Sequence, residues 1–467
     1  MAAISREYYL HFSGQKDDYE IEAIYERHAS LFSRAAVEDL RGAGSRELLE
    51  FAVQGLMGQE TKAEEAEVAR REASLEICVD DEVIALRQSR VVQANETDPE
   101  RRAAIERARL DVEARELTPL QVAVHERSVA IARELGWPSM LAMCEELSGI
   151  DLAALELQTE DFLRRTEALY EPLVEPQLQH HIGIGFDRLR RSDLSAFFRA
   201  PELDTAFPAG RLVESLRTTL AGIGIDLDSQ ANVVVDTEAR ETKTPRAFCA
   251  PVQVPDEVYL VIAPIGGMDD YEALLHEAGH TEHFAHVDPG LPFERRQLGD
   301  NSFTEAFAFL FQYLLEDRAW LHDVLGTDNA EPIAAHGDAA TLIHLRRYAA
   351  KLAYERRLHA ADARLDDMPE EYSRRLSAAL HVDWPRESWI SDVDPFFYSA
   401  RYLRAWAVER SVRGHLRERF GERWFAEPEA GELLREIWRK GQRAAAEELL
   451  EELGAPPAVD FGVLVPA

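Results

Sequence analysis

The chain has 467 residues, of which 52 are lysine or arginine and 86 are aspartate or glutamate, giving a formal net charge of −34 at pH 7. So large an acidic excess argues against binding to nucleic acid or to an anionic membrane surface. Hydrophobic residues make up 46 % of the chain, enough for a sizeable core, and the length fits two to four domains or one multi-lobed enzyme.

The cysteines and the N-terminal sequence bear on the compartment. Cys78, Cys144 and Cys249 lie far apart without CxxC spacing, so we expect no disulfide framework and a reducing cytoplasm. A metal-ligand role for Cys249 stays open, but candidate ligands elsewhere in the chain that are not thiolates disfavour it. The N-terminal sequence lacks a basic segment followed by an apolar one, and no apolar run approaches the length of a membrane span, so we expect neither a secretory leader nor a membrane segment.

Helical periodicity dominates the first third of the chain, from Asp17 to about Tyr170. Asp151 follows a Ser-Gly break, and we expect it or a neighbour to cap a helix that runs toward Tyr170. His180 and His181 then lie in a loop-like stretch, where they form a polar turn or, less often, bind metal. The clearest earlier helical segments are 48–56, 63–77, 83–94, 103–114, 120–135 and 140–147.

Short strands first appear after about Ser192. Runs rich in β-branched and aromatic residues predict strands at Ala231–Asp236, Pro245–Cys249 and Glu257–Ile262. The last of these leads into the next helix. Such a strand either offers its edge to an extended chain, which adds as a further strand, or is an ordinary core strand. After Asp317 the pattern is helical again to about residue 453.

The sequence that most strongly indicates a chemistry is His276-Glu277-Ala278-Gly279-His280, within the run from Met268 to His286. Residues four apart share one face of an α-helix. The two imidazoles can therefore hold one Zn²⁺, while the carboxylate beside the first reaches a water on that ion. Asp269 and Asp270 are candidates to cap the start of this helix.

A catalytic zinc needs a third protein ligand and one open position. His286 has the spacing of the third metzincin histidine, but that pattern has glycine where this chain has His283. If the helix continues, His286 lies about 9 Å further along it than His280 and about 240° around it, too far to share the ion. Glu305 is the better candidate, because the apolar helix that follows it buries the carboxylate, which then needs a partner.

Two other interpretations stay open. Ser302 and Glu305 match a capping box, in which the glutamate binds the helix backbone instead of a metal. The chain could also be a non-catalytic helical protein that binds zinc or peptide, although a structural zinc has four protein ligands and would leave Glu277 without a role. We prefer the gluzincin arrangement, a histidine pair and a glutamate one helix downstream, with one Zn²⁺ per chain.

Four segments, AFCAPV, VYLVIAP, DYEALLHEAGHTEH and FTEAFAFLFQ, occur in this order. Through them, over about Pro245–Leu315, the chain resembles the thimet oligopeptidase and oligoendopeptidase F family of zinc metallopeptidases. The resemblance implies a mainly α fold, with two helical lobes around a deep substrate channel and a small β-sheet beside the zinc site. We expect an N-terminal helical lobe at 1–190 and a catalytic lobe at 191–467.

The same resemblance implies that His276, His280 and Glu305 bind zinc and that Glu277 is the catalytic base. The implied activity is hydrolysis of peptide bonds in short peptides by an endopeptidase, with a carboxypeptidase of the helical gluzincin type as the alternative.

The family also has a tyrosine-rich segment near its C-terminus that binds substrate and stabilises the oxyanion. Its counterpart here begins at Tyr398, and the resemblance implies that Tyr402 is the oxyanion donor. Where the family often has a further tyrosine this chain has Ala405, so either Tyr398 substitutes for it or substrate handling differs. Both tyrosines could instead serve helix packing, since they are four residues apart.

Overall fold

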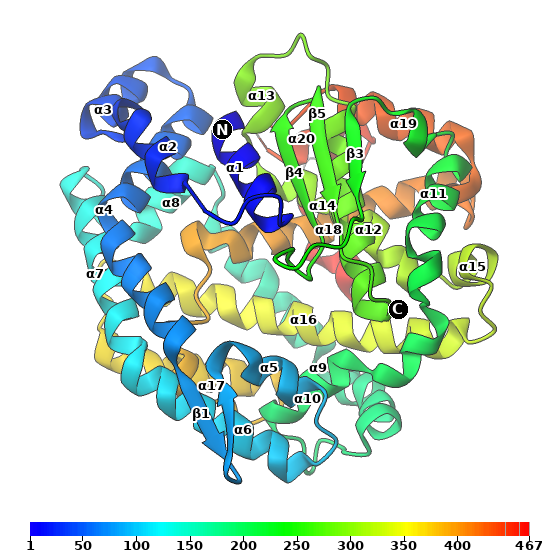
Figure 1. The fold of residues 1–467 in the computed structure, drawn as a ribbon, viewed down its shortest axis with the longest axis horizontal. Coiled ribbons are helices and arrows are strands. Elements are labelled where there is room, and N and C mark those ends of the chain that lie inside the picture. Colours follow the sequence, from blue (N-terminus) through cyan, green and yellow to red (C-terminus); the bar gives the residue numbers. More distant parts are fainter. Residues whose placement is uncertain (444, 457, 467) are drawn as a thin grey trace. The chain divides into compact units, whose positions relative to one another are not determined.

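The computed structural model describes residues 1–443, 445–456 and 458–466. The described chain is mainly α-helical, with one sheet of two strands and one of three (Figure 1). The predicted fold class, a mainly α protein with a small sheet, is confirmed. None of the helices in these ranges has both the length and the apolar character needed to cross a membrane.

The chain divides into two compact units, each built from segments far apart in the sequence. The first unit contains Met1–Ser30, Pro201–Asp338 and Arg401–Leu464, and the second contains Leu31–Ala200 and Ala339–Ala400 together with the last described residues. This division differs from the predicted boundary at residue 190. The difference arises because the chain crosses between the units several times, twice inside the helices α16 (Ala330–Leu358) and α18 (Tyr398–Phe420).

The first unit contains a three-stranded sheet in the order β3-β5-β4, with β3 parallel and β4 antiparallel to β5. β5 is paired on both sides, so of the two predicted alternatives it is the core strand and has no free edge for a substrate. The elements of this unit are β3 (Val233–Asp236), β4 (Phe248–Gln253), β5 (Glu257–Val261), α1 (Ala2–Phe12), α2 (Ile21–Arg27), α11 (Leu212–Gly222), α12 (Met268–Ala285), α13 (Phe293–Gln297), α14 (Asn301–Gln312), α15 (Arg318–Trp320), α19 (Pro428–Arg439) and α20 (Glu447–Glu452).

Helix α1 packs against this sheet at β4 (Figure 1). Tyr9 of α1 joins Phe248, Ala250 and Val261 in one buried cluster. Successive side chains of a strand point to opposite faces, so Cys249 points away from α1, and its thiol bonds with Thr281 of α12. The sheet thus lies between the N-terminal helix of the chain and the helix that carries the histidine motif.

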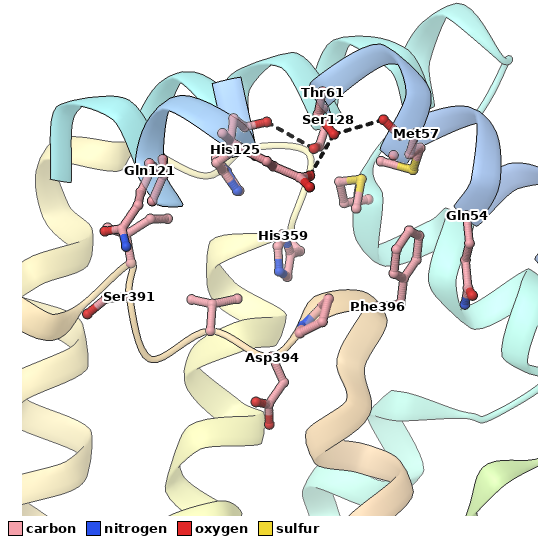
Figure 2. Close-up of a pocket in the computed structure, with 18 of the residues that line it drawn as sticks. Gln54, Met57, Thr61, Gln121, His125, Ser128, His359, Ser391, Asp394 and Phe396 are labelled. Atoms are coloured by element: carbon pink, nitrogen blue, oxygen red, sulfur yellow. Dashed lines mark hydrogen bonds between the residues drawn. The ribbon is translucent and has the colours of Figure 1, made fainter. Parts of the chain in front are cut away.

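The second unit is helical apart from the hairpin β1–β2. Its elements are α3 (Arg34–Ala43), α4 (Arg46–Ser74), β1 (Glu76–Val79), β2 (Glu82–Ala85), α5 (Leu86–Ala94), α6 (Pro99–Glu116), α7 (Thr118–Glu134), α8 (Met140–Ser148), α9 (Leu152–Ile182), α10 (Arg191–Arg199) and α17 (Met368–Leu380). One buried hydrophobic cluster of this unit joins Ile77 and Ile84 of the hairpin to Ile105 of α6. The sequence pattern missed this hairpin and split α4 into two segments. A cavity of about 600 Å³ lies in this unit between α4 and α7 on one side and residues 390–396 on the other, with His359 directed into it (Figure 2).

Helix α9 begins as predicted, because the Asp151 side chain accepts a hydrogen bond from the amide of Ala154. It continues past Pro172 and Pro176 and ends at Gly183, whose φ of +67° suits glycine. The predicted loop at His180 and His181 is therefore wrong, since both residues lie in the last turn of this helix.

Candidate metal centre

The candidate site is built on two helices, α12 and α14, that pack at very short range. A Cβ added to Gly279 would lie 2.3 Å from the carbonyl oxygen of Phe307 and 2.6 Å from Cα of Ala308. Only glycine permits this approach of the two backbones. The glycine inside the motif therefore sets how close the histidines of α12 come to the glutamate of α14.

The structure brings His276, His280 and Glu305 together. The Nε2 atoms of His276 and His280 lie 3.4 and 3.6 Å from Oε2 of Glu305. Tetrahedral zinc with bonds of about 2.0–2.1 Å requires ligand atoms about 3.3–3.4 Å apart. These residues are the one group of at least three His, Cys, Asp or Glu side chains in the described chain whose ligand atoms lie close enough to hold a metal ion.

Hydrogen bonds to the other ring nitrogens fix the two imidazoles. Nδ1 of His276 bonds with Oε1 of Gln312 at 2.8 Å, and Nδ1 of His280 bonds with Oγ1 of Thr304 at 2.9 Å. Gln312 donates through Nε2 to Glu272, so its oxygen faces His276 and accepts the Nδ1 proton. This tautomer leaves the Nε2 lone pair free for a metal. Sequence reasoning missed both partners, although Gln312 lies two helical turns after Glu305.

The charges around Glu305 and His276 favour a cation at this site. Burial raises the pKa of Glu305, but the charge of His280 and the hydrogen bonds from both imidazoles outweigh burial and hold that pKa well below its usual range. Burial likewise lowers the pKa of His276, whereas the contact with Glu305 raises it to about 9. The buried carboxylate of Glu305 therefore attracts positive charge, which either a proton on His276 or a divalent ion in its place can supply.

The capping-box alternative for Glu305 is wrong. The N-cap of α14 is Asp300, whose Oδ1 accepts a hydrogen bond from the amide of Ser302. Its other oxygen accepts hydrogen bonds from Arg404 at 2.8 Å and from the amide of Ala446 at 3.1 Å. Glu305 lies within the helix beyond this cap, and its carboxylate is directed to the histidines.

The start of α12 also differs from the prediction. Gly267 is the N-cap and offers no side chain. Asp270 instead accepts hydrogen bonds at 2.7 Å from the amides of Ile265 and Gly266, just before the helix. Asp204 accepts a bond from the amide of Met268, so two carboxylates stabilise this helix start.

Glu277 is held by the edge strand of the sheet. Its Oε2 accepts a hydrogen bond of 2.8 Å from the backbone amide of Cys249 in β4. This bond orients a carboxylate that adjoins a candidate ligand, His276, in sequence. The Cys249 amide could not have been identified from sequence, because backbone groups leave no trace in a residue pattern.

The remaining candidates do not join the metal group. His286 follows the last residue of α12, where its Nδ1 bonds with the carbonyl oxygen of Glu282 at 2.9 Å. The helix continues through His283, which is why the metzincin geometry fails. The thiol of Cys249 forms a hydrogen bond with Thr281, and burial raises the pKa of that thiol above its usual value.

The tyrosines differ in their relation to the site. Tyr402 belongs to the unit that carries the motif, and its ring lies 6.1 Å from that of Phe309. Phe309 in turn contacts the His276 ring at 5.4 Å, which places Tyr402 one residue removed from a candidate ligand. Tyr398 belongs to the second unit, at the start of α18.

Sequence reasoning also missed Tyr8. This residue of α1 is 38 % exposed and packs edge-on against Phe248 at 5.3 Å, next to the Cys249 amide that binds Glu277. Burial, and then the charge of Glu277, raise the pKa of the Tyr8 phenol. The first turns of the chain thus contribute an aromatic hydroxyl near the candidate base.

Comparison with known proteins gives matches in fold but not in sequence. No family model and no curated protein matches the chain. A structure assigned to oligoendopeptidase F of Bacillus anthracis str. Ames matches with a TM-score of 0.61 and 16 % identity over 98 % of this chain and 83 % of that chain. PZ peptidase A with an inhibitor matches with a TM-score of 0.66 and 15 % identity over 99 % and 89 %.

The chain therefore has the fold of solved peptidase structures over nearly its whole length. The resemblance predicted from short motifs is confirmed at the level of the fold.

Proposed function

We propose that this protein is a zinc-dependent metallopeptidase of the thimet oligopeptidase and oligoendopeptidase F type, which hydrolyses peptide bonds in short peptides. The observation that carries the proposal is the convergence of His276, His280 and Glu305 at separations of 3.4 and 3.6 Å, which match a tetrahedral zinc. The fold shared with two solved peptidase structures supports the same conclusion.

Bound zinc would act as a Lewis acid that polarises the scissile carbonyl and acidifies a water. Glu277 then removes a proton from the attacking water and delivers it to the leaving amine. The amide of Cys249, which bonds to Glu277 at 2.8 Å, keeps the carboxylate oriented for both transfers. Gln312 and Thr304 hold the two imidazoles, so the ligands are arranged before substrate arrives.

Tyr402 completes the proposal as a hydrogen-bond donor to the oxygen that becomes negative during attack. Its partial exposure and its contact with Phe309 beside His276 support this role. Tyr398, on the same helix, is proposed as a substrate contact. A donor of this kind acts on charge that develops only in the transition state.

The proposal is tested with Glu277→Gln and with a matched control, Glu432→Gln, at an exposed position of α19. Both purified variants are analysed for zinc by elemental mass spectrometry and incubated with internally quenched peptides, with and without a chelator. We expect one zinc per chain in both, cleavage only by the control, and loss of that cleavage with chelator. Full turnover by Glu277→Gln would refute the mechanism.

The mode of cleavage is tested with the same peptides carrying a blocked C-terminus. An endopeptidase cleaves them, whereas a carboxypeptidase needs a free carboxylate. Zinc bound without any chelator-sensitive cleavage of a mixed peptide library would favour a non-catalytic binding protein instead.

A further inference from the structure

Tyr8 of α1 lies beside the candidate base and has no role in the proposed mechanism. Its ring packs edge-on against Phe248 at 5.3 Å and contacts Phe12 at 4.4 Å. Phe248 directly precedes Cys249, whose amide donates to Glu277 at 2.8 Å. Tyr8 and Glu277 therefore approach the same part of β4, one from α1 and the other from α12.

Helix α1 is fixed to the sheet on both sides of Tyr8. The Arg6 guanidinium donates to the Glu257 carboxylate of β5 at 2.5 Å. Tyr9 is buried and stacks on Tyr259 of the same strand, with ring centroids 3.7 Å apart. Because residues before and after Tyr8 contact β5, the position of the phenol is set before a ligand arrives.

The hydroxyl of Tyr8 is available to a ligand. The residue is 38 % exposed, and within the described chain its hydroxyl forms no hydrogen bond. Burial and, to a smaller extent, the charge of Glu277 raise the pKa of this phenol, so it keeps its proton at neutral pH and can donate. A fixed donor beside the base can thus bond with an acceptor on a bound molecule.

The separation of this hydroxyl from Glu277 is short on the scale of a peptide. The influence of a charge on another group is largely screened beyond about 10 Å. The hydroxyl, whose pKa the Glu277 carboxylate raises, therefore lies within about that distance of it. An extended peptide advances about 3.3 Å per residue, so a peptide with its scissile bond at Glu277 has about three residues within reach of Tyr8.

The acceptor that every peptide residue offers is its backbone carbonyl oxygen. In a helix this oxygen is already bonded to an amide four residues further along, whereas an extended chain leaves it free. A donor at Tyr8 therefore matches extended peptides, whatever their side chains.

We propose that Tyr8 binds the peptide substrate by donating a hydrogen bond to a backbone carbonyl oxygen that flanks the scissile bond within about three residues. The substrate class that this contact selects is an extended peptide, irrespective of its side chains. The inference rests on the proposed peptidase function and adds to it a binding residue from the N-terminal helix.

A role for Tyr8 in positioning Glu277 is the alternative, but the contacts favour the substrate. Oε2 of Glu277 already accepts a hydrogen bond from the Cys249 amide. The hydrogen bonds among the described residues include none between Tyr8 and Glu277. The two roles differ in whether the hydroxyl interacts with one particular carbonyl of the peptide.

The contact is tested by removing its two partners separately and together. Fluorescent peptides are prepared in which one amide at a time, on either side of the scissile bond, is replaced by an alkene isostere that lacks the carbonyl oxygen. Their binding is measured with the zinc-loaded Glu277→Gln enzyme, in which the peptide stays intact. We expect one isostere to bind about fivefold more weakly than the unmodified peptide. The loss should disappear when Tyr8→Phe is added, because the donor is then absent from both complexes.

Tyr19→Phe is the matched control. Tyr19 is similarly exposed, at 41 %, and its ring contacts Phe12 at 5.6 Å, so the substitution removes a phenol hydroxyl from a neighbouring ring. The fivefold loss should persist in this variant. In enzyme that retains Glu277, Tyr8→Phe should raise KM about fivefold and leave kcat and zinc content unchanged, since a bond remote from the reacting atoms is equal in the ground state and the transition state.

The inference is overturned if no isostere binds more weakly, or if the loss in Tyr8→Phe equals that in Tyr19→Phe. A fall in kcat with unchanged KM would also overturn it, because Tyr8 would then position Glu277. The proposed peptidase function survives each of these results, since chelator-sensitive cleavage by the parent enzyme measures it separately. A parent enzyme that neither binds zinc nor cleaves peptides would instead refute the function itself.

Discussion

The packing at Gly279 yields the sharpest prediction about the metal centre. Gly279→Ala would place a Cβ 2.3 Å from the Phe307 carbonyl oxygen, where ordinary contact begins at 3.4 Å. Helices α12 and α14 must then separate by about 1 Å, since both partners are backbone and no side chain can rotate away. Overpacking of this kind costs about 1–3 kcal/mol of stability.

The same displacement should weaken zinc binding, because the ligands are divided between the two helices. His276 and His280 move with α12 and Glu305 moves with α14, whereas zinc bond lengths tolerate only about 0.2 Å. We expect the zinc dissociation constant to rise about 10- to 100-fold, as it does when groups supporting a metal ligand are lost.

The assays are urea unfolding of the chelated protein and zinc competition against a chromophoric chelator. Gly414→Ala is the control, because Gly414 lies exposed in α18 and its added Cβ meets nothing within 4 Å. Gly414→Ala should raise the urea midpoint of unfolding, since alanine favours a helix by up to about 1 kcal/mol over glycine. If Gly279→Ala matched the control in both assays, the assignment of Gly279 as the spacer between the ligand helices would be refuted.

Three further outcomes follow from the site. Gln312→Leu removes the acceptor for Nδ1 of His276, so zinc affinity should fall about 10- to 100-fold in the same competition assay; an unchanged affinity would contradict the orienting role. Although burial raises the pKa of Asp300, the charge of Arg404 lowers it to about 2, below the usual value of 3.8 for an aspartate. The resulting stabilisation of about 2 kcal/mol is present above pH 4 and lost as the pH falls toward 2. Asp300→Asn should therefore show a lower urea midpoint near neutral pH and a smaller loss between pH 4 and 2 than the parent. Tyr402→Phe should reduce kcat about 10²- to 10³-fold with zinc content unchanged. A rise in KM with kcat unchanged would instead assign the phenol to substrate binding.

The helical character of the chain and most of its candidate metal site could be predicted from sequence, because both depend on local spacing. His276 and His280 share a helix face by virtue of their four-residue separation. Glu305 was identified from a carboxylate at the start of an apolar helix that would bury it. These inferences required no knowledge of which helix packs against which.

The errors occurred where distant segments meet or where local cues were ambiguous. The hairpin β1–β2 was taken as the ends of helices, because four-residue strands carry too little periodicity to distinguish the two. The substrate-edge prediction fell on β5, although pairing with both β3 and β4 makes it the central strand. Sheet order is a property of long-range pairing, which a single sequence does not display.

The sequence by itself thus determined the helix-borne motif, its third carboxylate and a mainly helical chain, since residues a few positions apart have fixed relative directions in a helix. Only the tertiary structure decided that Gln312 and Thr304 orient the imidazoles, that the amide of Cys249 holds Glu277, and that α1 packs against the strand beside this carboxylate. It also decided that each compact unit is assembled from separated segments. These features depend on contacts between residues remote in the chain, and such contacts are fixed by packing of the whole core.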